Sequence, residues 1–511
     1  MRKIKSFFAV VALLLSAAVS FAQVKVSGSV KEATGEVIAG AAVQLKGSAT
    51  TYALTDALGN YKSTVPSDGV LVVSCLGYLP TEVAVNGRTV VDVILTPDSE
   101  KLEDVVVVAY GTVSKESLTG SVTTLKSDEI ASAPVTSVDK MLAGKLAGVT
   151  VTSGSGQPGS TSTIRVRGTS SISAGNEPLW VIDGIPMMAS DFRQLANVGV
   201  GGGSSSTFLN PNDIESITVL KDAAAASIYG SRAANGVILV TTKTGRSGNA
   251  RFTARAKYGV QQLANDNNLR PLTGLEALEY KRTAVINAGQ DPDDPTGSMY
   301  FPYTLLENGC DNWYKELTKI GSIQEYEINA TAGNERSSYY SSVAYHKNDG
   351  VYHGLNFQRF TARVNADSQL TKKLKTGTRV NVSYSDSNSP QMGNSYYINP
   401  QFAMWHPLPW HKVRNEDGSW NYGISEMSNN NPLAAVGNDI YNDKEYRMQG
   451  NVYLEYKILP TLTFKTTNGV EFLYLESRQY WSPNGGKQGR DATAFNIWTT
   501  DIRYTTSNTL T

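Results

Sequence analysis

The sequence has little cysteine, little histidine and no surplus of either charge. Of its 511 residues, two are cysteines, Cys75 and Cys310, and four are histidines. Two isolated thiols in different regions form neither a disulfide framework nor a metal site. His406 and His411 lack a third obvious ligand, so no metal is expected. Lysine plus arginine and aspartate plus glutamate both total 46, so charge gives no reason to expect nucleic acid as a partner.

Long apolar runs are also missing after the first 22 residues. Met1 to Ala22 has a basic start, an apolar centre at 7–15 and a small-x-small site at Ser20-Phe21-Ala22, which predict a cleaved secretory signal. Its apolar run is shorter than the stretch of about 20 residues that a transmembrane helix needs. The rest of the chain contains no helical span, although the weaker strand pattern of a transmembrane β-barrel is still compatible with it.

Residues 23–97 are short apolar segments separated by glycine turns. The segments lie at 24–30, 41–46, 69–75, 82–85 and 90–95, with a turn at 56–61. This regular spacing predicts a small β-sandwich. The region has no histidine, and its acids fall mostly in turns, so it holds no catalytic cluster.

Residues 113–245 predict a small α+β domain. Strands are expected at 149–152, 163–168, 179–182 and 236–243, a helical turn at 127–130 and a short helix at 137–146. Asp183-Gly184 predicts a structural turn. The segment from Gly154 to Gly159 formally matches a dinucleotide-binding pattern, but Pro158 and the strand after it replace the helix N-terminus that would hold a pyrophosphate. No cofactor is therefore expected.

From Arg251 onward the hydropathy alternates with a period of two residues. In one such segment Phe360, Ala362, Val364 and Ala366 share a face, and Arg359, Arg363, Asn365 and Asp367 share the other. A strand with one lipid face and one wet face requires this pattern. We expect eight strands, at 250–261, 322–332, 337–347, 358–369, 374–386, 445–457, 462–475 and 495–508.

The connections between these strands alternate in length. Tight links at 333–336, 371–373 and 459–461 alternate with connections of ten residues or more, of which 262–321 and 387–444 are the longest. Outer-membrane barrels combine short periplasmic turns with long external loops in this way. The fold class expected is therefore mainly β: a β-sandwich, an α+β domain at 113–245 and part of a large antiparallel transmembrane β-barrel at 246–511.

The size of the α+β domain bears on the size of the barrel. Eight strands enclose an interior that their own side chains fill, whereas a domain of this length has a radius of gyration of about 14 Å. A plugged barrel of roughly 22 strands can hold such a domain, and Thr509-Leu510-Thr511 lacks an aromatic closing end. We expect the chain to be the N-terminal part of a longer protein.

The linker at 98–112 contains four consecutive valines, Val105 to Val108. Such a run strongly favours extended backbone. On its own it is compatible with an ordinary buried strand, or with a strand that pairs with another protein's sheet edge. Its place between a sandwich and the α+β domain favours the docking strand.

Several motifs together resemble one family. NPNDIESITVLKDAAAASIYGSRAANGVILVTTKTG (Asn210 to Gly245) and IRVRGTSSISAGNEPLWVIDGIP (Ile164 to Pro186) resemble plug motifs of SusC/RagA-like TonB-dependent outer-membrane transporters. EDVVVVAYGT (Glu103 to Thr112) resembles the TonB box of that family. GAAVQLKG, TDALGNY and VSCLGY, within 23–97, resemble a carboxypeptidase regulatory-like domain, which implies a binding or spacer module.

The resemblance implies energy-coupled import across the outer membrane, with residues 23–97 in the periplasm. The expected partners are the TonB complex of the inner membrane, a SusD-like surface lipoprotein, outer-membrane lipid, and an oligosaccharide substrate or, as the alternative, a peptide or other nutrient. The residues expected to pair with TonB are Asp104, Val105, Val106, Val107, Val108, Ala109 and Tyr110.

Two further groups of residues are weaker candidates. Arg165 and Arg167 are expected to form ion pairs with acids on the barrel wall, or else to be exposed strand charges. Trp405, Trp410 and Trp420 lie in one long loop, where their rings can stack on sugar faces or simply pack against neighbouring loops. A surface binding or adhesion protein is the competing function. A secreted hydrolase has little support, because no nucleophile, carboxylate pair or metal cluster converges.

Overall fold

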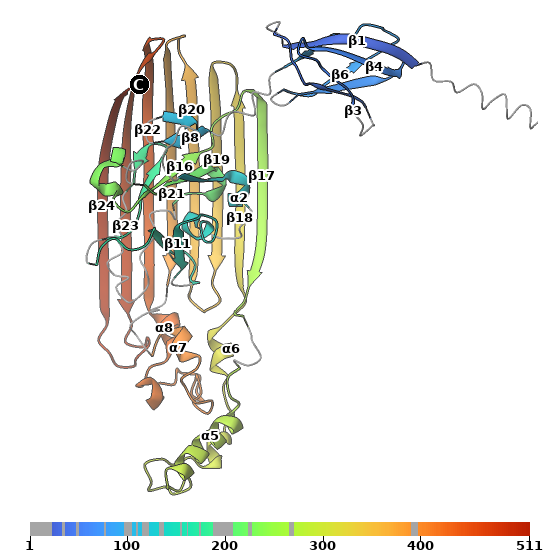
Figure 1. Ribbon diagram of the computed structural model, residues 1–511. Coiled ribbons are helices and arrows are strands. Elements are labelled where there is room, and N and C mark those ends of the chain that lie inside the picture. The colour runs from blue at the N-terminus through green and yellow to red at the C-terminus, as the bar shows by residue number, and fades with distance from the viewer. Residues whose placement is uncertain are drawn as a thin grey trace, which may run out of the picture. The chain divides into compact units, whose positions relative to one another are not determined.

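The computed structural model describes residues 23–32, 36–46, 51–75, 78–96, 105–108, 111–114, 122–131, 137–153, 156–160, 162–172, 175–187, 208–222, 227–264, 270–389 and 397–511. The chain divides into two compact units, Met1–Val105 and Val106–Thr511. Both are built mainly from β-strands (Figure 1). No helix in the described ranges is long and apolar enough to cross a membrane.

The first unit is a sandwich of two small sheets. One sheet has the order β4 (Asn60–Pro66), β1 (Gln23–Glu32), β7 (Val93–Leu95), and the other has β3 (Thr51–Leu54), β2 (Ala42–Leu45), β5 (Val70–Ser74), β6 (Thr81–Ala84). Side chains from both sheets, among them Val30, Val43 and Leu71, meet in one buried core. The predicted sandwich is confirmed, but β3 and most of β4 lie outside the predicted segments.

A two-stranded sheet of β8 (Val105–Val108) and β9 (Gly111–Ser114) lies between the sandwich and the α+β domain in the sequence.

The α+β domain at 113–245 is built on a five-stranded sheet. Its strand order is β10 (Val122–Lys126), β15 (Ile214–Leu220), β16 (Val237–Thr242), β13 (Leu179–Ile182), β14 (Ile185–Pro186). A separate hairpin pairs β11 (Val149–Ser153) with β12 (Ser162–Val166). The helices are short: α2 (Ser127–Ala131), α3 (Val138–Met141), η3 (Pro211–Asp213) and η4 (Ser227–Ala233).

The helix predicted at 137–146 ends early. It stops at Met141 because the chain then turns, with Gly144 and Gly148 at φ values of 72° and 70° that favour glycine. Strands β15 and β16 are buried over most of their length, and their apolar side chains contribute to two buried clusters. Ile217, Val219 and Ile238 are fully buried there and form the centre of the domain.

The third part is one antiparallel sheet of eight strands in chain order, called here the large sheet. The strands are β17 (Gly248–Gln261), β18 (Gly321–Gly333), β19 (Ser337–Asp349), β20 (Asn356–Gln369), β21 (Leu374–Asn388), β22 (Ile440–Leu459), β23 (Leu462–Trp481) and β24 (Thr493–Leu510). Each pairs with the next over a long register, with irregularities between Gly248 and Arg251 of β17 and between Lys457 and Leu459 of β22. All eight predicted strands are confirmed.

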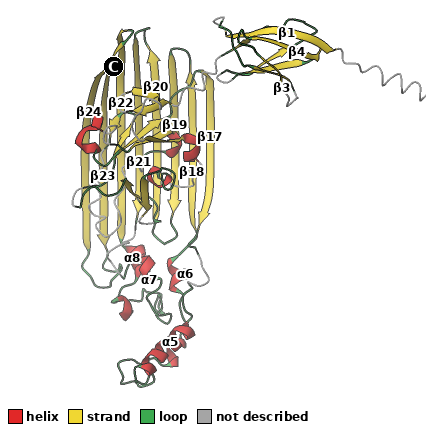
Figure 2. Cartoon of the chain, in the orientation of Figure 1, coloured by secondary structure: helices red, strands yellow, loops and turns green. Residues whose placement is uncertain are grey.

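The connections differ between the two ends of the large sheet. At one end the strands are joined by the tight links predicted from the sequence. At the other end residues 350–355 form a link of six residues, shorter than the ten or more predicted, and the two longest connections carry helices (Figure 2). These elements are α5 (Gly274–Asn287), η6 (Tyr303–Leu306), α6 (Trp313–Leu317), α7 (Pro400–Ala403), η7 (Ser425–Met427) and α8 (Pro432–Asn438). Loops from three connections share a buried core that includes Trp313, Leu355, Met404 and Ile424.

Candidate functional site

A tight turn of the α+β domain presents Asp183 to the large sheet. Asp183 and Gly184, between β13 and β14, have φ values of 48° and 84°. Both are left-handed, as a two-residue hairpin of the primed type requires. The Asp183 carboxylate accepts hydrogen bonds from the Thr242 backbone N–H at 3.0 Å and from its hydroxyl at 2.8 Å. The turn is thereby fixed to the end of β16.

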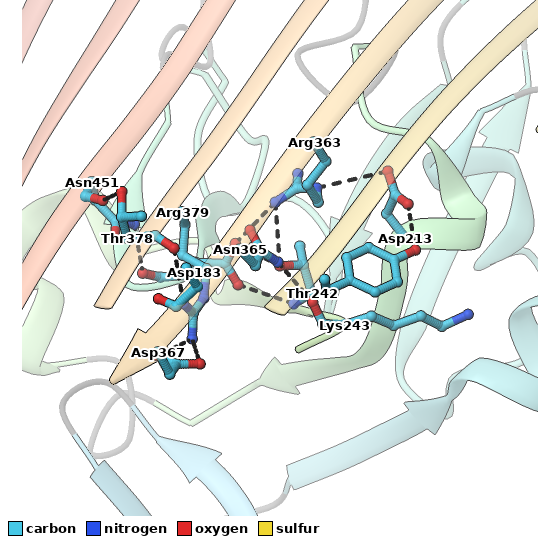
Figure 3. A network of polar contacts seen from close by, with 12 residues as sticks. Asp183, Asp213, Thr242, Lys243, Arg363, Asn365, Asp367, Thr378, Arg379 and Asn451 are labelled. Atoms are coloured by element: carbon cyan, nitrogen blue, oxygen red, sulfur yellow. Dashed lines mark hydrogen bonds and ion pairs between the residues drawn. The ribbon is translucent and has the colours of Figure 1, made fainter. Parts of the chain in front are cut away.

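Arg363 of β20 reaches this turn from the large sheet (Figure 3). Its Nη1 lies 3.3 Å from Asp183 Oδ2 and donates to the Thr242 hydroxyl at 3.2 Å, and its Nε lies 3.7 Å from Asp213 Oδ2. The arginine side chain is only 2% exposed. A cation buried to this extent requires nearby carboxylates, because desolvation otherwise costs several kcal/mol. Asp183 and Asp213 supply that compensation.

Three other strand residues bond to the same part of the domain. Asn365 Nδ2 donates to the Thr242 hydroxyl at 2.9 Å and to the Lys243 carbonyl at 2.7 Å. Asn451 Nδ2 donates to the Asp183 carbonyl at 3.3 Å, and the Tyr340 hydroxyl donates to Asp213 Oδ1 at 2.8 Å. Side chains of β19, β20 and β22 therefore hold the domain through polar contacts.

Close packing adds to these polar contacts. Gly469 of β23 lies against the Ile185 side chain, and a Cβ at that glycine would be 2.5 Å from Ile185 Cδ1. A glycine at this position lets the β13–β14 turn approach the strand.

A separate ion pair fastens the large sheet to itself beside this site. Arg379 of β21 binds Asp367 of β20 through two hydrogen bonds, at 2.9 and 2.8 Å. The Tyr453 hydroxyl of β22 donates to the same carboxylate at 2.5 Å. These three residues link neighbouring strands and make the sheet a firm support for the contact with the α+β domain.

Comparison with known proteins identifies the parts of the chain. Residues 114–237 match the family described as TonB-dependent Receptor Plug Domain, and residues 26–108 match the CarboxypepD_reg-like domain family. TonB-dependent receptor P26 of Formosa agariphila is 36% identical over 451 residues, which are 88% of this chain and 42% of the relative. TonB-dependent receptor SusC of Bacteroides thetaiotaomicron is 34% identical over 476 residues, with coverage of 88% and 44%.

The chain belongs to the SusC/RagA-like TonB-dependent receptors. It spans less than half the length of the curated relatives it matches. Among solved structures, the RagAB peptide importer in its open-open state is similar with a TM-score of 0.66 and 25% identity, over 80% of this chain and 46% of that chain. The α+β domain is thus the receptor's plug, and the contact described above joins the plug to the large sheet.

The two arginines predicted to hold the receptor's plug have other partners. Arg165 lies 2.6 Å from Glu177, and Arg167 forms an ion pair with Asp222 at 2.5 Å. Both carboxylates belong to the plug, so the predicted ion pairs with the wall are wrong for the described residues. Arg165 alternates with the buried Ile164 and Val166 on β12, and the hairpin β11–β12 turns it toward the plug's own Glu177 loop.

The residues that do make this contact were visible in the sequence only in part. Arg363 and Asn365 belong to the polar face that the sequence predicts for their strand, and the sequence also predicts a turn at Asp183, which its φ of 48° confirms. The pairing between them spans 180 residues of sequence. The sequence shows a charged face on one strand and an Asp-Gly turn in another domain. Neither pattern indicates that the two contact each other.

The three tryptophans all lie in the loops, and each has a neighbour. Trp405 is 47% exposed and its ring lies 5.6 Å from that of Tyr314, while Trp410 meets Phe301 edge-on at 6.2 Å. Arg414 covers a face of Trp420 at 3.6 Å from the ring centroid. Trp405 and Trp410 thereby join the 389–439 loop to the 262–320 loop, as the plainer alternative of loop packing predicts.

The two long loops are also joined by polar contacts around His411. The Trp313 indole donates to the His411 carbonyl at 2.8 Å, and Asp311 accepts from the Val413 N–H at 2.8 Å. His411 Nδ1 lies 3.1 Å from Glu426, and this bond lowers the pKa of the Glu426 carboxyl to about 2. In the described part of the chain no group of three His, Cys, Asp or Glu side chains is placed to hold a metal ion.

The candidate docking strand is partly described. Val105–Val108 is strand β8 and is paired with β9. Asp104, Ala109 and Tyr110 lie outside the described residues. The extended backbone predicted for the valine run is confirmed, and the pairing of Asp104–Tyr110 with a partner protein stays a prediction.

Proposed function

We propose that this receptor imports nutrients, most of all oligosaccharides, across the outer membrane, driven by the TonB complex of the inner membrane. The leader at 1–22 directs export, and residues 23–97 lie in the periplasm. Asp104–Tyr110 pairs as a strand with TonB, and a SusD-like surface lipoprotein closes over the long loops. The strand edge supplies main-chain hydrogen bonds, so this pairing needs little side-chain specificity.

The observation that carries the proposal is the inverted burial of the large sheet. On β20 the polar residues Arg359, Arg363 and Asn365 are buried, whereas Phe360 and Val364 on the other face are 44% and 51% exposed. A water-soluble sheet would bury the apolar face instead. Exposed apolar residues on the strands, with polar residues facing a plug, suit a sheet whose outer face contacts lipid.

The plug contact suggests how pulling opens a path. Strand β10 follows the docking strand in the sequence and pairs with β15 of the plug sheet in a continuous register from Val122↔Leu220 to Lys126↔Ser216. Force on β8 therefore passes through β10 into the plug sheet. The bonds that Arg363, Asn365 and Asn451 make to the plug can be exchanged for bonds to water, each at a net cost of about 0.5–3 kcal/mol. Pulling breaks this polar contact before it unfolds the apolar interior of the plug.

A backbone substitution in the docking strand tests the proposal. Val106→Pro removes a main-chain donor and disfavours strand pairing, whereas Val106→Ile keeps a β-branched side chain and an intact backbone. We expect uptake of the receptor's substrate to fall at least tenfold in Val106→Pro, with surface binding unchanged, and to stay normal in Val106→Ile. Normal uptake by Val106→Pro, or by a deletion of Asp104–Tyr110, contradicts the importer.

Two alternative functions, import of peptides and surface binding without import, are tested with a deletion strain and with the Val106→Pro cells. A peptide substrate is favoured by the similarity to the RagAB peptide importer, and growth of a deletion strain on panels of glycans and peptides as sole nutrients separates the two classes. A surface binding or adhesion protein would hold its ligand equally well in wild-type and Val106→Pro cells and accumulate none of it inside.

A further inference from the structure

A small cavity lies between the plug and the large sheet, beside β17 to β20. The plug contributes Met141 of α3 and residues 210–212 to its lining, and the four strands contribute the rest. The cavity is distinct from the polar contact at Asp183, since its lining residues are different ones. Its volume is about 30 Å³, which gives room for one or two water molecules. Only a very small ligand therefore fits.

Three buried side chains in the lining each have a polar atom without a partner. These atoms are Asn210 Nδ2, Glu327 Oε2 and His346 Nε2, none of which makes a hydrogen bond with a described residue. The three residues are 3%, 6% and 4% exposed. Buried polar atoms nearly always have a partner, either a protein group or an ordered water molecule. One cavity thus collects three unmet hydrogen-bonding groups, one from the plug and two from the strands.

Two of these side chains are already held in place by their other polar atom. Asn210 Oδ1 accepts from the Asn212 backbone N–H at 3.1 Å, at the start of η3, and Glu327 Oε1 accepts from Asn329 Nδ2 at 3.0 Å. Asn210 Nδ2 and Glu327 Oε2 cannot turn away without breaking these bonds. They are therefore fixed as one donor and one acceptor at the same cavity.

The charges around the cavity balance one another. The lining contains two cations and two carboxylates, namely Lys257, Arg359, Glu325 and Glu327. Lys257 Nζ lies 3.3 Å from Glu325 Oε2, and His346 Nδ1 lies 3.4 Å from Glu325 Oε1. A bound cation would face the Asn210 donor and a bound anion would face the Glu327 carboxylate, so neither kind of ion suits these groups. Water suits them, because it donates and accepts hydrogen bonds at once.

We propose that this cavity binds one or two ordered water molecules, which bridge Asn210 of the plug to Glu327 and His346 of the large sheet. Water-mediated hydrogen bonds are nearly as favourable as direct ones. When the plug moves, the groups on both sides keep or regain water as their partner, so the bridge eases the separation of the plug from the sheet. The water site stands on the cavity and its side chains alone, whereas its role in plug release rests on the proposed import function.

Hydroxyl-radical labelling of the whole receptor in detergent tests the water site. A short X-ray pulse splits water into radicals, which oxidise methionine side chains next to the water molecules, and mass spectrometry measures the oxidation. Met141 is the probe, because it lines the cavity and is only 5% exposed. Met427, which is 0% exposed in the core of the long loops, is the internal reference.

A pair of leucines removes both strand partners of the water. The variant combines Glu327→Leu and His346→Leu, and a cavity with apolar walls stays dry. The control combines Gln324→Leu and Lys347→Leu, a cross-strand pair on the same two strands. Gln324 and Lys347 point to the opposite face of the sheet, because successive side chains of a strand alternate between its faces.

We expect Met141 to be oxidised at least about fivefold faster than Met427 in wild type and control, because ordered water lies beside it. In the leucine variant its oxidation should slow at least about threefold, because the cavity is then dry. Equally slow oxidation of the two methionines in wild type overturns the water site, whether or not the variant folds. Unchanged oxidation of Met141 in a folded leucine variant overturns it as well.

Uptake by cells with equal amounts of surface receptor tests the role in plug release. Leucines at this contact lose free energy when water reaches them, so uptake should fall at least threefold in the leucine variant and stay normal in the control. Normal uptake by a leucine variant whose Met141 is protected overturns the role. If Val106→Pro cells import normally, the importer fails, while the labelling result at Met141 is unaffected.

Discussion

The interior of the plug and its contact with the large sheet are built from opposite kinds of residue. Inside, Ile217, Val219 and Ile238 are fully buried among other apolar side chains. At the contact, Arg363 and Asn365 bond to carboxylates, a hydroxyl and a backbone carbonyl. The plug is held together by apolar packing and held in place mainly by hydrogen bonds.

This difference matters because water can replace only one of the two kinds of interaction. Exposing apolar surface costs about 25 cal/mol per Å², and no water contact restores it. A broken protein hydrogen bond is largely replaced by bonds to water, so its net contribution is only about 0.5–1.5 kcal/mol, or about 1.5–3 kcal/mol to a charged group. The proposed import requires the plug to leave its place intact, and an attachment by hydrogen bonds suits that proposal.

The largest effect is expected from a charge placed in the plug interior. Ile217→Asp buries an unpaired carboxylate at a position with 0% exposure, which costs about 4 kcal/mol or more. Backbone amides of β15 and β16 should then exchange with deuterated solvent roughly a thousandfold faster, as measured by mass spectrometry on the solubilised receptor. Ser216→Asp, at the half-buried neighbouring position, is the control. Unchanged protection in Ile217→Asp would show that this apolar cluster does not hold the plug together.

A smaller and more local effect is expected at the contact. Arg363→Met removes the cation and leaves Asp183 and Asp213 without it, at a cost of about 2–3 kcal/mol. Exchange should increase at 183–187 and 240–243, while the amides at the centre of β15 stay protected because their apolar neighbours are unchanged. Arg478→Met, which removes an exposed arginine paired with Glu476 on its own strand, is the control. If Arg363→Met increases amide exchange at the centre of β15 as much as at the turn, the contact with the large sheet also stabilises the interior of the plug, and the distinction between the two fails.

Much of the fold follows from the sequence because long strands repeat their signal many times. Each strand of the large sheet has 13 residues or more, and an alternation of that length has no helical interpretation. The strand β4 is shorter, and its inward positions are Tyr61, Ser63 and Val65. The buried Ser63 in the middle of that face interrupts the apolar alternation, so the sequence does not predict this strand.

The candidate site follows from the sequence only as two separate halves. The polar face with Arg363 and the turn at Asp183 were each predictable from local patterns, alternation in one and turn chemistry in the other. Their meeting depends on how the plug is placed against the strands, which no local pattern records. For the same reason the sequence does not identify the partner of Arg165. A charged strand residue is expected either to be exposed or to have a counter-ion, but the local pattern does not show where that counter-ion lies.

The smallest effect is expected for that arginine, and it gives the sharpest test of the comparison. Arg165 and Glu177 are 26% and 43% exposed, so water and salt screen their attraction, and such pairs contribute about 0–1 kcal/mol. Arg165→Ala should change exchange in β11 and β12 by less than about fivefold and leave 183–187 and 240–243 unaffected. A double-mutant cycle with Glu177→Ala isolates the pair. If Arg165→Ala instead increases amide exchange at 183–187 as much as Arg363→Met does, Arg165 also holds the plug in place. The burial of an ion pair would then not distinguish the arginines that hold the plug from those that do not.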